Sequence, residues 1–415
     1  MTAVAGLRGT GDWGTDERPK NFREGILFFQ PNGNSPIFGL TSKAGKKTVD
    51  DPEFSWWNEG QTLVRLRVAG ELASGDTVVT VDSVDPTSVT LGANYGTAKH
   101  LKPGDLLLVE PTADNATFNH ELVEVVNVIS DTQFSVTRGA GGTSAATIAN
   151  DVFLLLIGSA YAEGTGAPRA TSRNPIKFSN YTQIFKDSYE LSGTADETKA
   201  RTGNAWSNDK KRKSYDHARA IELSILYGRK AEIPAADNGK PKRYMGGLRS
   251  FLPAANVTVF STAVGRDSFL DAVSPLFQFE TGAGDTRIAF MGRMAANELS
   301  KIFAEEVQYN VSNKVTVYGL DFQEFNFPVG RVLVKVHPLM SQHTGTGGLR
   351  QERAAYILDF DALKYVSLKN RDTKTKDDVQ NKDEDVRRGF IQTECSIMVD
   401  YGGLTMGYLG NISAT

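Results

Sequence analysis

Residues 174–228 combine an extended strand pattern, a polar stretch and one long helix pattern. Apolar and polar residues alternate from Ile176 to Tyr181, which is the period of a β-strand. The segment carries no recognisable catalytic constellation. A segment with this much reach and no pocket chemistry predicts a protein that contacts copies of itself.

The helix pattern predicts a long amphipathic helix over 207–228. Ser207 or Asn208 is a good N-cap type, and Gly228 is a typical helix stop. The first turns carry four cations that oppose the helix dipole, so an acidic partner surface would stabilise them. We favour a solvated helix face over a nucleic-acid contact for this group. The apolar stripe is Tyr215, Ala218, Ile221 and Ile225, and the cations are Lys210, Lys211, Arg212 and Lys213.

A second strand pattern, at 61–68, is the expected partner of the strand at 176–181. Together the two strands would form a long hairpin. An isolated two-stranded hairpin is marginal in water, so we expect this one to lie across a neighbouring subunit.

Residues 71–158 show short strand patterns separated by turn signals. Such spacing predicts a small β-sandwich or barrel, inserted at the tip of the hairpin. Within it, Phe134 and Val136 are expected to face the core, because they alternate with polar neighbours.

Composition limits the domain count and the partners. With 415 residues the chain is too long for one core, so two or three domains are expected. The net charge of −3 argues against a whole-protein electrostatic grip on nucleic acid. The most apolar run, at 152–157, is far shorter than the ~20 residues of a membrane span, so we expect a soluble protein without a membrane partner.

Residue types that carry catalysis or bind metals are scattered. The histidines show no HxH or HxxxH spacing and Cys395 is the single cysteine, so neither a zinc site nor an intrachain disulfide is predicted. A GxGxxG match at 9–14 lacks the strand and helix of a dinucleotide site. The TGTGG loop at 344–348 lacks a GKS/T continuation, and Glu305-Glu306 point to different helix faces. We predict no catalytic, cofactor or metal site and no enzymatic activity. The histidines are His100, His120, His217, His337 and His343.

Trp56 and Trp57 form an aromatic pair close to the predicted hairpin strands. Paired tryptophans can stack on a sugar or a base, but packing in a core or a subunit contact is the favoured interpretation. Cys395 is interpreted as a buried strand residue and not as a reactive thiol, since nothing beside it in sequence would lower its pKa.

The order of parts and several short words resemble one known family. The words are NYTQIF and SGTA within 180–195, AIELSILYG at 220–228 and GGLRSFL at 246–252. They resemble the major capsid proteins of tailed bacteriophages with the HK97-type shell fold, and within these the group typified by phage SU10. The words GDLLLVE and SVTRGAGGT also resemble an insertion in that group.

The resemblance implies an α+β fold of the HK97 type with an inserted small all-β domain. The implied parts are an N-terminal arm at 1–50, an extended hairpin loop at 51–70 and 159–195, the inserted domain at 71–158, a peripheral domain at 196–260 and 361–415 with its spine helix at 207–228, and an axial domain at 261–360.

The implied function is self-assembly into the icosahedral or prolate shell that encloses viral double-stranded DNA, without sequence-specific DNA binding. The implied partners are copies of the chain in hexamers and pentamers, with scaffolding, portal and decoration proteins as further candidates. The implied location is the virion, after assembly in the bacterial host cytoplasm. The alternatives are a phage tail, fibre or decoration protein, and a carbohydrate-binding or carbohydrate-acting protein that uses the tryptophan pair and the inserted domain.

Two further expectations concern the hairpin. Some relatives crosslink a hairpin lysine to an asparagine of a neighbour, but no matched asparagine is evident for Lys177 or Lys186, so we expect no crosslink. Residues 192–194 are expected to act as a hinge when the shell expands.

Overall fold

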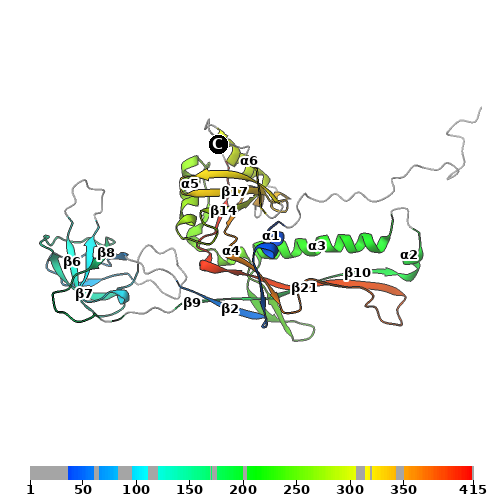
Figure 1. Cartoon of the computed structure of the whole chain (residues 1–415), viewed down its shortest axis with the longest axis horizontal. Coiled ribbons are helices and arrows are strands. Elements are labelled where there is room, and N and C mark those ends of the chain that lie inside the picture. The colour runs from blue at the N-terminus through cyan, green and yellow to red at the C-terminus, as the bar shows by residue number, and fades with distance from the viewer. Residues whose placement is uncertain are drawn as a thin grey trace, which may run out of the picture.

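The computed structural model describes residues 36–59, 65–82, 96–110, 120–168, 170, 175–199, 203–304, 314–317, 320–342 and 350–413. The GxGxxG match at 9–14, most of the arm predicted at 1–50, Glu305-Glu306, His343 and the TGTGG loop lie outside these residues. Figure 1 shows an elongated molecule, with a β module at one end, a central body, and an arm built from a helix and a strand ladder at the other.

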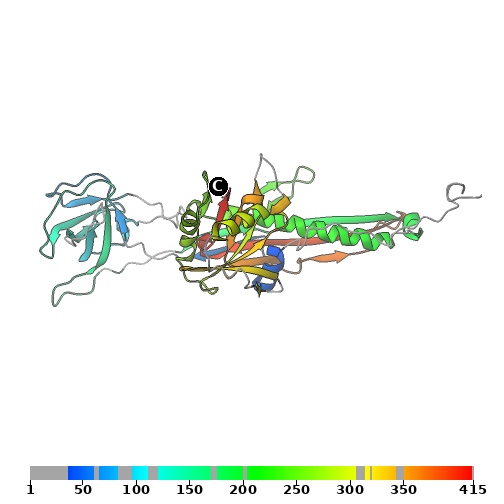
Figure 2. The ribbon, with the colours of Figure 1, turned by 90° about the horizontal axis from the view of Figure 1, so that it is seen from above.

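The arm and the lower part of the body share one five-stranded sheet. β10 pairs antiparallel with β21 along ten positions, from Gln183 opposite Cys395 to Ser192 opposite Val386. Helix α3 lies along this ladder, and Figure 2 shows from above how narrow the resulting arm is. The strands run in the order β1 (Lys46–Val49), β19 (Leu363–Leu368), β21 (Val386–Val399) and β10 (Gln183–Ser192), with β20 (Lys374–Lys376) also paired to β21.

Helix α3 spans Ala205–Tyr227, with Asn204 as its N-cap and Gly228 as its C-cap. The predicted stop at Gly228 is confirmed, but the predicted start at Ser207 or Asn208 is too late. The Asn204 side chain accepts the N–H of Ser207 at 2.9 Å, and the first turn buries Trp206. A tertiary contact of Trp206, which the sequence pattern does not report, therefore extends the helix at its N-terminus.

The second large sheet has seven strands, and both of its faces are buried. On β14, Ile288 and Phe290 pack toward α3 and the first sheet, while Ala289 and Met291 pack under α5 and α6. The strand order is β13 (Val257–Val259), β22 (Gly407–Gly410), β18 (Ala355–Leu358), β14 (Thr286–Met291), β17 (Gly330–Val336), β16 (Leu320–Phe327) and β15 (Lys314–Val317), and the two helices are α5 (Arg266–Val273) and α6 (Arg293–Ala304).

Shorter elements complete the body. They are α1 (Pro36–Ala44), α2 (Gly193–Glu197), α4 (Leu248–Phe251) and the hairpin β11 (Ala231–Pro234) and β12 (Pro241–Tyr244).

The hairpin strand pairing predicted from the sequence is wrong. The partner of β9 (Ile176–Tyr181) is β2 (Glu53–Asn58), and not 61–68. Arg65–Arg67 instead forms β3, which pairs with Phe153–Leu155 inside the β module. Both segments alternate, but β2 carries the larger aromatic residues, and these pack on Val366 and Met398 of the body. The described part of the β2–β9 hairpin is therefore supported by its own chain and does not need a neighbour for stability.

The β module is a six-stranded antiparallel sheet. A bridge between Val68 and Val81 joins the ends of its first and last strands, so the sheet closes on itself as a small barrel. Phe134 and Val136 are buried in its core, as predicted. The strand order is β3 (Arg65–Arg67), β8 (Phe153–Ser159), β5 (Asp105–Val109), β6 (Leu122–Val128), β7 (Gln133–Ala140) and β4 (Val78–Thr80).

Candidate assembly surfaces

A buried carboxylate joins three separate parts of the body. Glu222, in the C-terminal part of α3, has no exposed surface. Its Oε1 and Oε2 atoms accept the N–H groups of Ile37 at 3.0 Å and Phe38 at 2.8 Å, which are the unsatisfied donors of the first turn of α1. Its Oε1 also lies 2.7 Å from Nε2 of His337, at the end of β17. This arrangement fixes α1 on α3 and the seven-stranded sheet.

The hydrogen bonds determine the tautomer of His337. Nδ1 of His337 accepts the N–H of Met340 at 3.3 Å, so Nδ1 carries no proton. Nε2 then carries the hydrogen and donates to Glu222. A neutral imidazole and two backbone N–H groups thus donate hydrogen bonds to the buried carboxylate. Without such partners, burial of this charge would be strongly unfavourable.

A second histidine fixes the arm. His217 of α3 lies between Asp187 of β10, at 2.6 Å from Nδ1 to Oδ2, and Thr393 of β21, at 2.8 Å from Nε2 to Oγ1. The imidazole therefore bridges the helix to both strands beneath it. The helix contacts both strands of this ladder, and His217 joins it to each of them by a side-chain contact.

One of the basic residues at the start of α3 pairs with a carboxylate of the same chain. Nζ of Lys210 lies 2.6 Å from Asp377, which also accepts a hydrogen bond from Tyr189. The bonds from Lys210 and Tyr189 lower the pKa of Asp377. Trp206 packs edge-on against Tyr189, with ring centroids 4.8 Å apart, and Arg387 lies 4.4 Å from the Trp206 ring. These contacts stabilise the outer end of the arm.

The predicted hinge at 192–194 has no loop. β10 ends at Ser192 and α2 begins at Gly193, and the Ser192 hydroxyl accepts the N–H of Ala195 at 3.4 Å. A Cβ atom at Gly193 would lie 2.1 Å from a carboxylate oxygen of Asp385, so the junction is closely packed. Hinge motion at this point stays a prediction.

The two adjacent tryptophans have different environments. The Trp56 indole is buried, donates its N–H to the carbonyl of Val399 at 3.0 Å and stacks between Phe54 and Phe178. The next side chain, Trp57, is 62% exposed on the opposite face of β2. Core packing is thus confirmed for Trp56, and the pair cannot form the shared stacking platform that the carbohydrate alternative requires.

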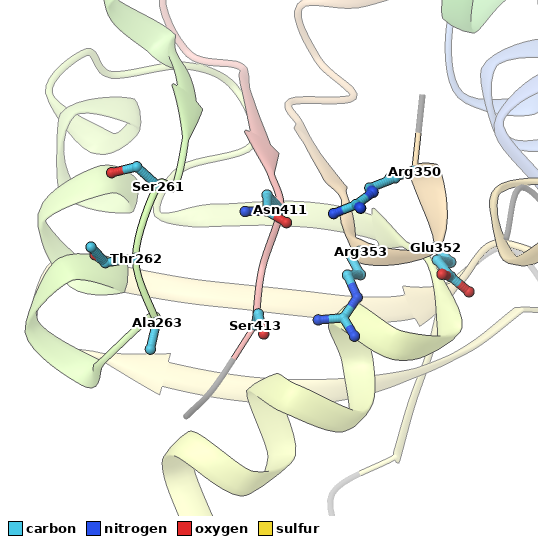
Figure 3. Close-up of a pocket in the computed structure, with 8 residues that line it drawn as sticks. All are labelled: Ser261, Thr262, Ala263, Arg350, Glu352, Arg353, Asn411 and Ser413. Atoms are coloured by element: carbon cyan, nitrogen blue, oxygen red, sulfur yellow. The ribbon is translucent and has the colours of Figure 1, made fainter. Parts of the chain in front are cut away.

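An open hollow of about 550 Å³ lies beside the C-terminal strand (Figure 3). Arg350 and Arg353 project toward Asn411 and Ser413, while Glu352 points away from them. Two guanidinium groups at this spacing can hold a carboxylate or a phosphate. The remaining lining residues are Ser261, Thr262 and Ala263.

Among the described residues, the contacts above join elements of one chain through hydrogen bonds, ion pairs and ring contacts. No group of three or more His, Cys, Asp or Glu side chains in these ranges is placed to hold a metal ion. None of the helices in the described ranges has the length and apolar character required to cross a bilayer. The described surfaces present apolar side chains and charged groups, which can contact another protein.

A profile of the SU10 major capsid protein family matches residues 6–409. The chain belongs to the SU10 major capsid protein family. The major capsid protein of Pseudomonas phage PaMx41 is 28% identical over 387 residues, which cover 91% of this chain and 85% of that protein. The chain is thus a phage major capsid protein, whose copies assemble into the capsid shell of the virion.

Solved capsids also align with the structure. The capsid of an empty GTA particle aligns with a TM-score of 0.46 at 10% identity, over 96% of each chain. The capsid of cyanophage A-1(L) aligns with a TM-score of 0.43 at 9% identity, over 96% of this chain and 98% of that one.

The family and the function predicted from the sequence are confirmed. The α+β class is also confirmed, and a two-stranded hairpin, a long helix and a seven-stranded sheet are present in the described residues. The contact of Glu222 with α1 and His337 was not predicted from the sequence. The one indication was a carboxylate in the largely apolar segment 221–226, and the sequence does not show which residues bind it.

Proposed function

We propose that this major capsid protein forms hexamers and pentamers that close into an icosahedral or prolate shell around double-stranded DNA. The observation that carries the proposal is the open side of the arm. Phe185 and Tyr189 of β10 are covered by α3, whereas Ile184 on the other face is 50% exposed. Among the described residues, no strand pairs with the outer edge of β10. An arm of only two layers with a free face and a free edge suits side-by-side packing against further copies.

We assign the parts of the subunit as the sequence resemblance implies. Of the N-terminal arm predicted at 1–50, the residues before α1 would lie over neighbours, because α1 and β1 belong to the body. Of the hairpin predicted at 51–70 and 159–195, the β2–β9 ladder would lie over neighbours, because Arg65–Arg67 belongs to the β module. The peripheral domain at 196–260 and 361–415 would form the shell wall. The axial domain at 261–360 would meet its copies at the hexamer and pentamer centres. The inserted domain, predicted at 71–158 but with a core that begins at Leu66, would project from the outer surface, and this core shares no residue with the two cores of the body.

The chemistry proposed for the shell is passive. With a net charge of −3 the wall would confine DNA without binding it strongly or in a sequence-specific way. We propose that the protein is not an enzyme, that it uses no cofactor, and that assembly takes place in the host cytoplasm. Scaffolding, portal and decoration proteins remain candidate partners. Lys177 and Lys186 are exposed on β9 and β10, and we propose that neither forms a covalent crosslink.

Expression of the full chain alone in bacterial cells, followed by electron cryomicroscopy of the particles, tests the proposal. Closed shells, or plates of hexamers, are the expected result. Tubes would also support a capsid protein, fibres or trimers would instead support a tail or fibre protein, and a stable monomer at high concentration would contradict shell assembly altogether. Denaturing gels of purified shells should show a single band at the mass of one chain, since ladders of higher mass would reveal a covalent crosslink.

A further inference from the structure

A second hollow, of about 350 Å³, opens where the hairpin leaves the body. Trp57 and Tyr401 are its large exposed side chains, with 62% and 40% of their surfaces accessible. An exposed tryptophan is unusual on a surface that has no partner. The complete lining is Trp57, Asn58, Glu59, Asp361, Lys364, Asp400 and Tyr401.

The walls of this hollow are held in place from behind. With the Asn58 amide turned so that its oxygen faces the turn at 400–403, this oxygen accepts the N–H groups of Tyr401 at 3.1 Å and Gly402 at 2.9 Å and fixes the turn against β2. Trp56, the residue before Trp57, is tied to the carbonyl of Val399 at 3.0 Å. The hollow therefore keeps its shape without an occupant.

The backbone at Tyr401 is strained. Its φ is 55°, in the left-handed region that favours glycine, although Gly402 follows directly. A bulky residue in this conformation carries strain, which the surrounding structure must compensate. Such strain is concentrated at functional positions, and here it presents the Tyr401 ring to the solvent.

The chemistry of the lining favours a cation. Glu59, Asp361 and Asp400 supply three carboxylates against the single ammonium group of Lys364, which lies 2.5 Å from Oδ2 of Asp400. Lys177 is opposite Trp57 in the β2–β9 ladder but does not line the hollow. Aromatic faces next to carboxylates are the surroundings in which a guanidinium or ammonium group binds best.

We propose that a second copy of this chain inserts an arginine or lysine side chain into this hollow, stacked on Trp57 and Tyr401 and balanced by Asp361. The inference rests on the proposed shell assembly and names one of its anchor points. A phosphate group would be repelled by the carboxylates, so nucleic acid is disfavoured as the occupant. Trp, Tyr and Arg are the residues that carry most of the energy at protein interfaces.

The direct test is a benzophenone amino acid placed at position 57 of the full chain. Shells are assembled from an equal mixture of ¹⁵N-labelled and unlabelled subunits, irradiated and analysed by mass spectrometry. We expect crosslinks that join labelled to unlabelled peptides, with Lys or Arg next to the crosslinked residue. Crosslinks confined to one chain, or to peptides without a cation, would overturn the inference. The same amino acid at Ile233, which is 50% exposed, serves as the position control.

A second measurement uses substitutions. Trp57→Ala should raise the subunit concentration needed for assembly by roughly tenfold or more, as for a hot-spot residue. Asp361→Asn should raise it less, and Trp57→Phe should recover part of the loss. Ile233→Ala is the matched control and should assemble like the unaltered chain. If Trp57→Ala and Ile233→Ala assemble equally well, the inference is wrong while shell assembly stands. If the unaltered chain itself forms no shells, it is the proposed function that fails.

Discussion

Nε2 of His337 donates a hydrogen bond to Oε1 of Glu222 over 2.7 Å, in a site where neither side chain is exposed. The same carboxylate accepts the N–H groups of Ile37 and Phe38. One side chain of α3 therefore positions both the first described helix of the chain and the end of β17. The same elements also share an apolar core, to which Ile37, Ile221 and Leu333 contribute.

Glu222→Ala should destabilise the body severely. The change leaves the imidazole of His337 and two backbone N–H groups buried without an acceptor. Each buried donor left without an acceptor costs about 1–3 kcal/mol, and three donors are affected here. Urea unfolding of the full chain should register the loss, and hydrogen exchange should rise first at Ile37 and Phe38. The control is Glu232→Ala, which removes a partly exposed pair with Arg243 and should change the unfolding free energy by less than about 1 kcal/mol.

The contact between Glu222 and His337 could not be predicted from the sequence alone. Glu222 and His337 are separated by 115 positions, so no local pattern connects them. The helix that carries Glu222 was predictable, because its apolar spacing and Gly228 stop are local. The start of that helix was not, since the burial of Trp206 against Tyr189 depends on a strand in another part of the chain.

Gly228→Ala should disrupt the end of the spine helix. A Cβ atom at this position would lie 2.5 Å from the carbonyl oxygens of Met245 and Ser224, and neither backbone can move without breaking the contact with Gly247. Overpacking of this kind costs about 1–3 kcal/mol. The comparison is Gly75→Ala, where no atom lies within 4 Å. Thermal unfolding should show a clear fall in the melting temperature for the first variant and almost none for the second.

The β module should weaken in acid. Burial raises the pKa of Glu121, but the hydrogen bonds from Arg138, Ala146 and Gly139 outweigh it and hold this pKa below the ordinary value of 4.5. A lowered folded-state pKa contributes stability above pH 4.5, and that stability is lost as the pH falls through the folded-state pKa. Hydrogen exchange across β6 and β7 should therefore accelerate as the pH falls through the folded-state pKa of Glu121, after correction for the pH dependence of the intrinsic exchange rate.

Glu121→Gln separates this effect from general acid sensitivity. The variant should be less stable by about 3–5 kcal/mol at neutral pH, because Arg138 stays buried without its counter-charge. Its stability should also depend less on pH than that of the unaltered chain. Glu163→Gln, at an exposed position, should leave both properties unchanged. An unaltered pH profile in Glu121→Gln would show that other carboxylates control acid unfolding.

The module should also fold when expressed alone as residues 65–161. Among the described residues, the buried members of its core run from Leu66 to Leu154, and the bridge between Val68 and Val81 closes the sheet within these limits. A single cooperative unfolding transition by circular dichroism is the expected result. A chain that stays unfolded at neutral pH would show that the body supplies part of the stability.

The strands of the module were predictable from the sequence, but its boundary was not. Its inner strands and the burial of Phe134 and Val136 followed from alternation and turn residues. The pairing of its first strand did not, because 53–58 and 65–67 alternate equally well and only the packing of Trp56 on the body distinguishes them. The exposed state of Trp57 was equally hidden, since two adjacent tryptophans look alike until the register of β2 is known.

Cys395 should be unreactive in the native chain. Burial raises the pKa of its thiol to about 12, and the nearby charges of Asp372 and Glu394 act in the same direction, against a hydrogen bond with Tyr365 that lowers it. At pH 8 roughly one thiol in ten thousand would then be ionised, and the thiolate is the reactive species. A chromogenic disulfide reagent should therefore modify the thiol slowly before unfolding and at once in concentrated guanidinium chloride. Rapid modification of the folded chain at pH 8 would show that β21 opens locally around this residue, and Cys395→Ser, which should give no signal under either condition, identifies the thiol being measured.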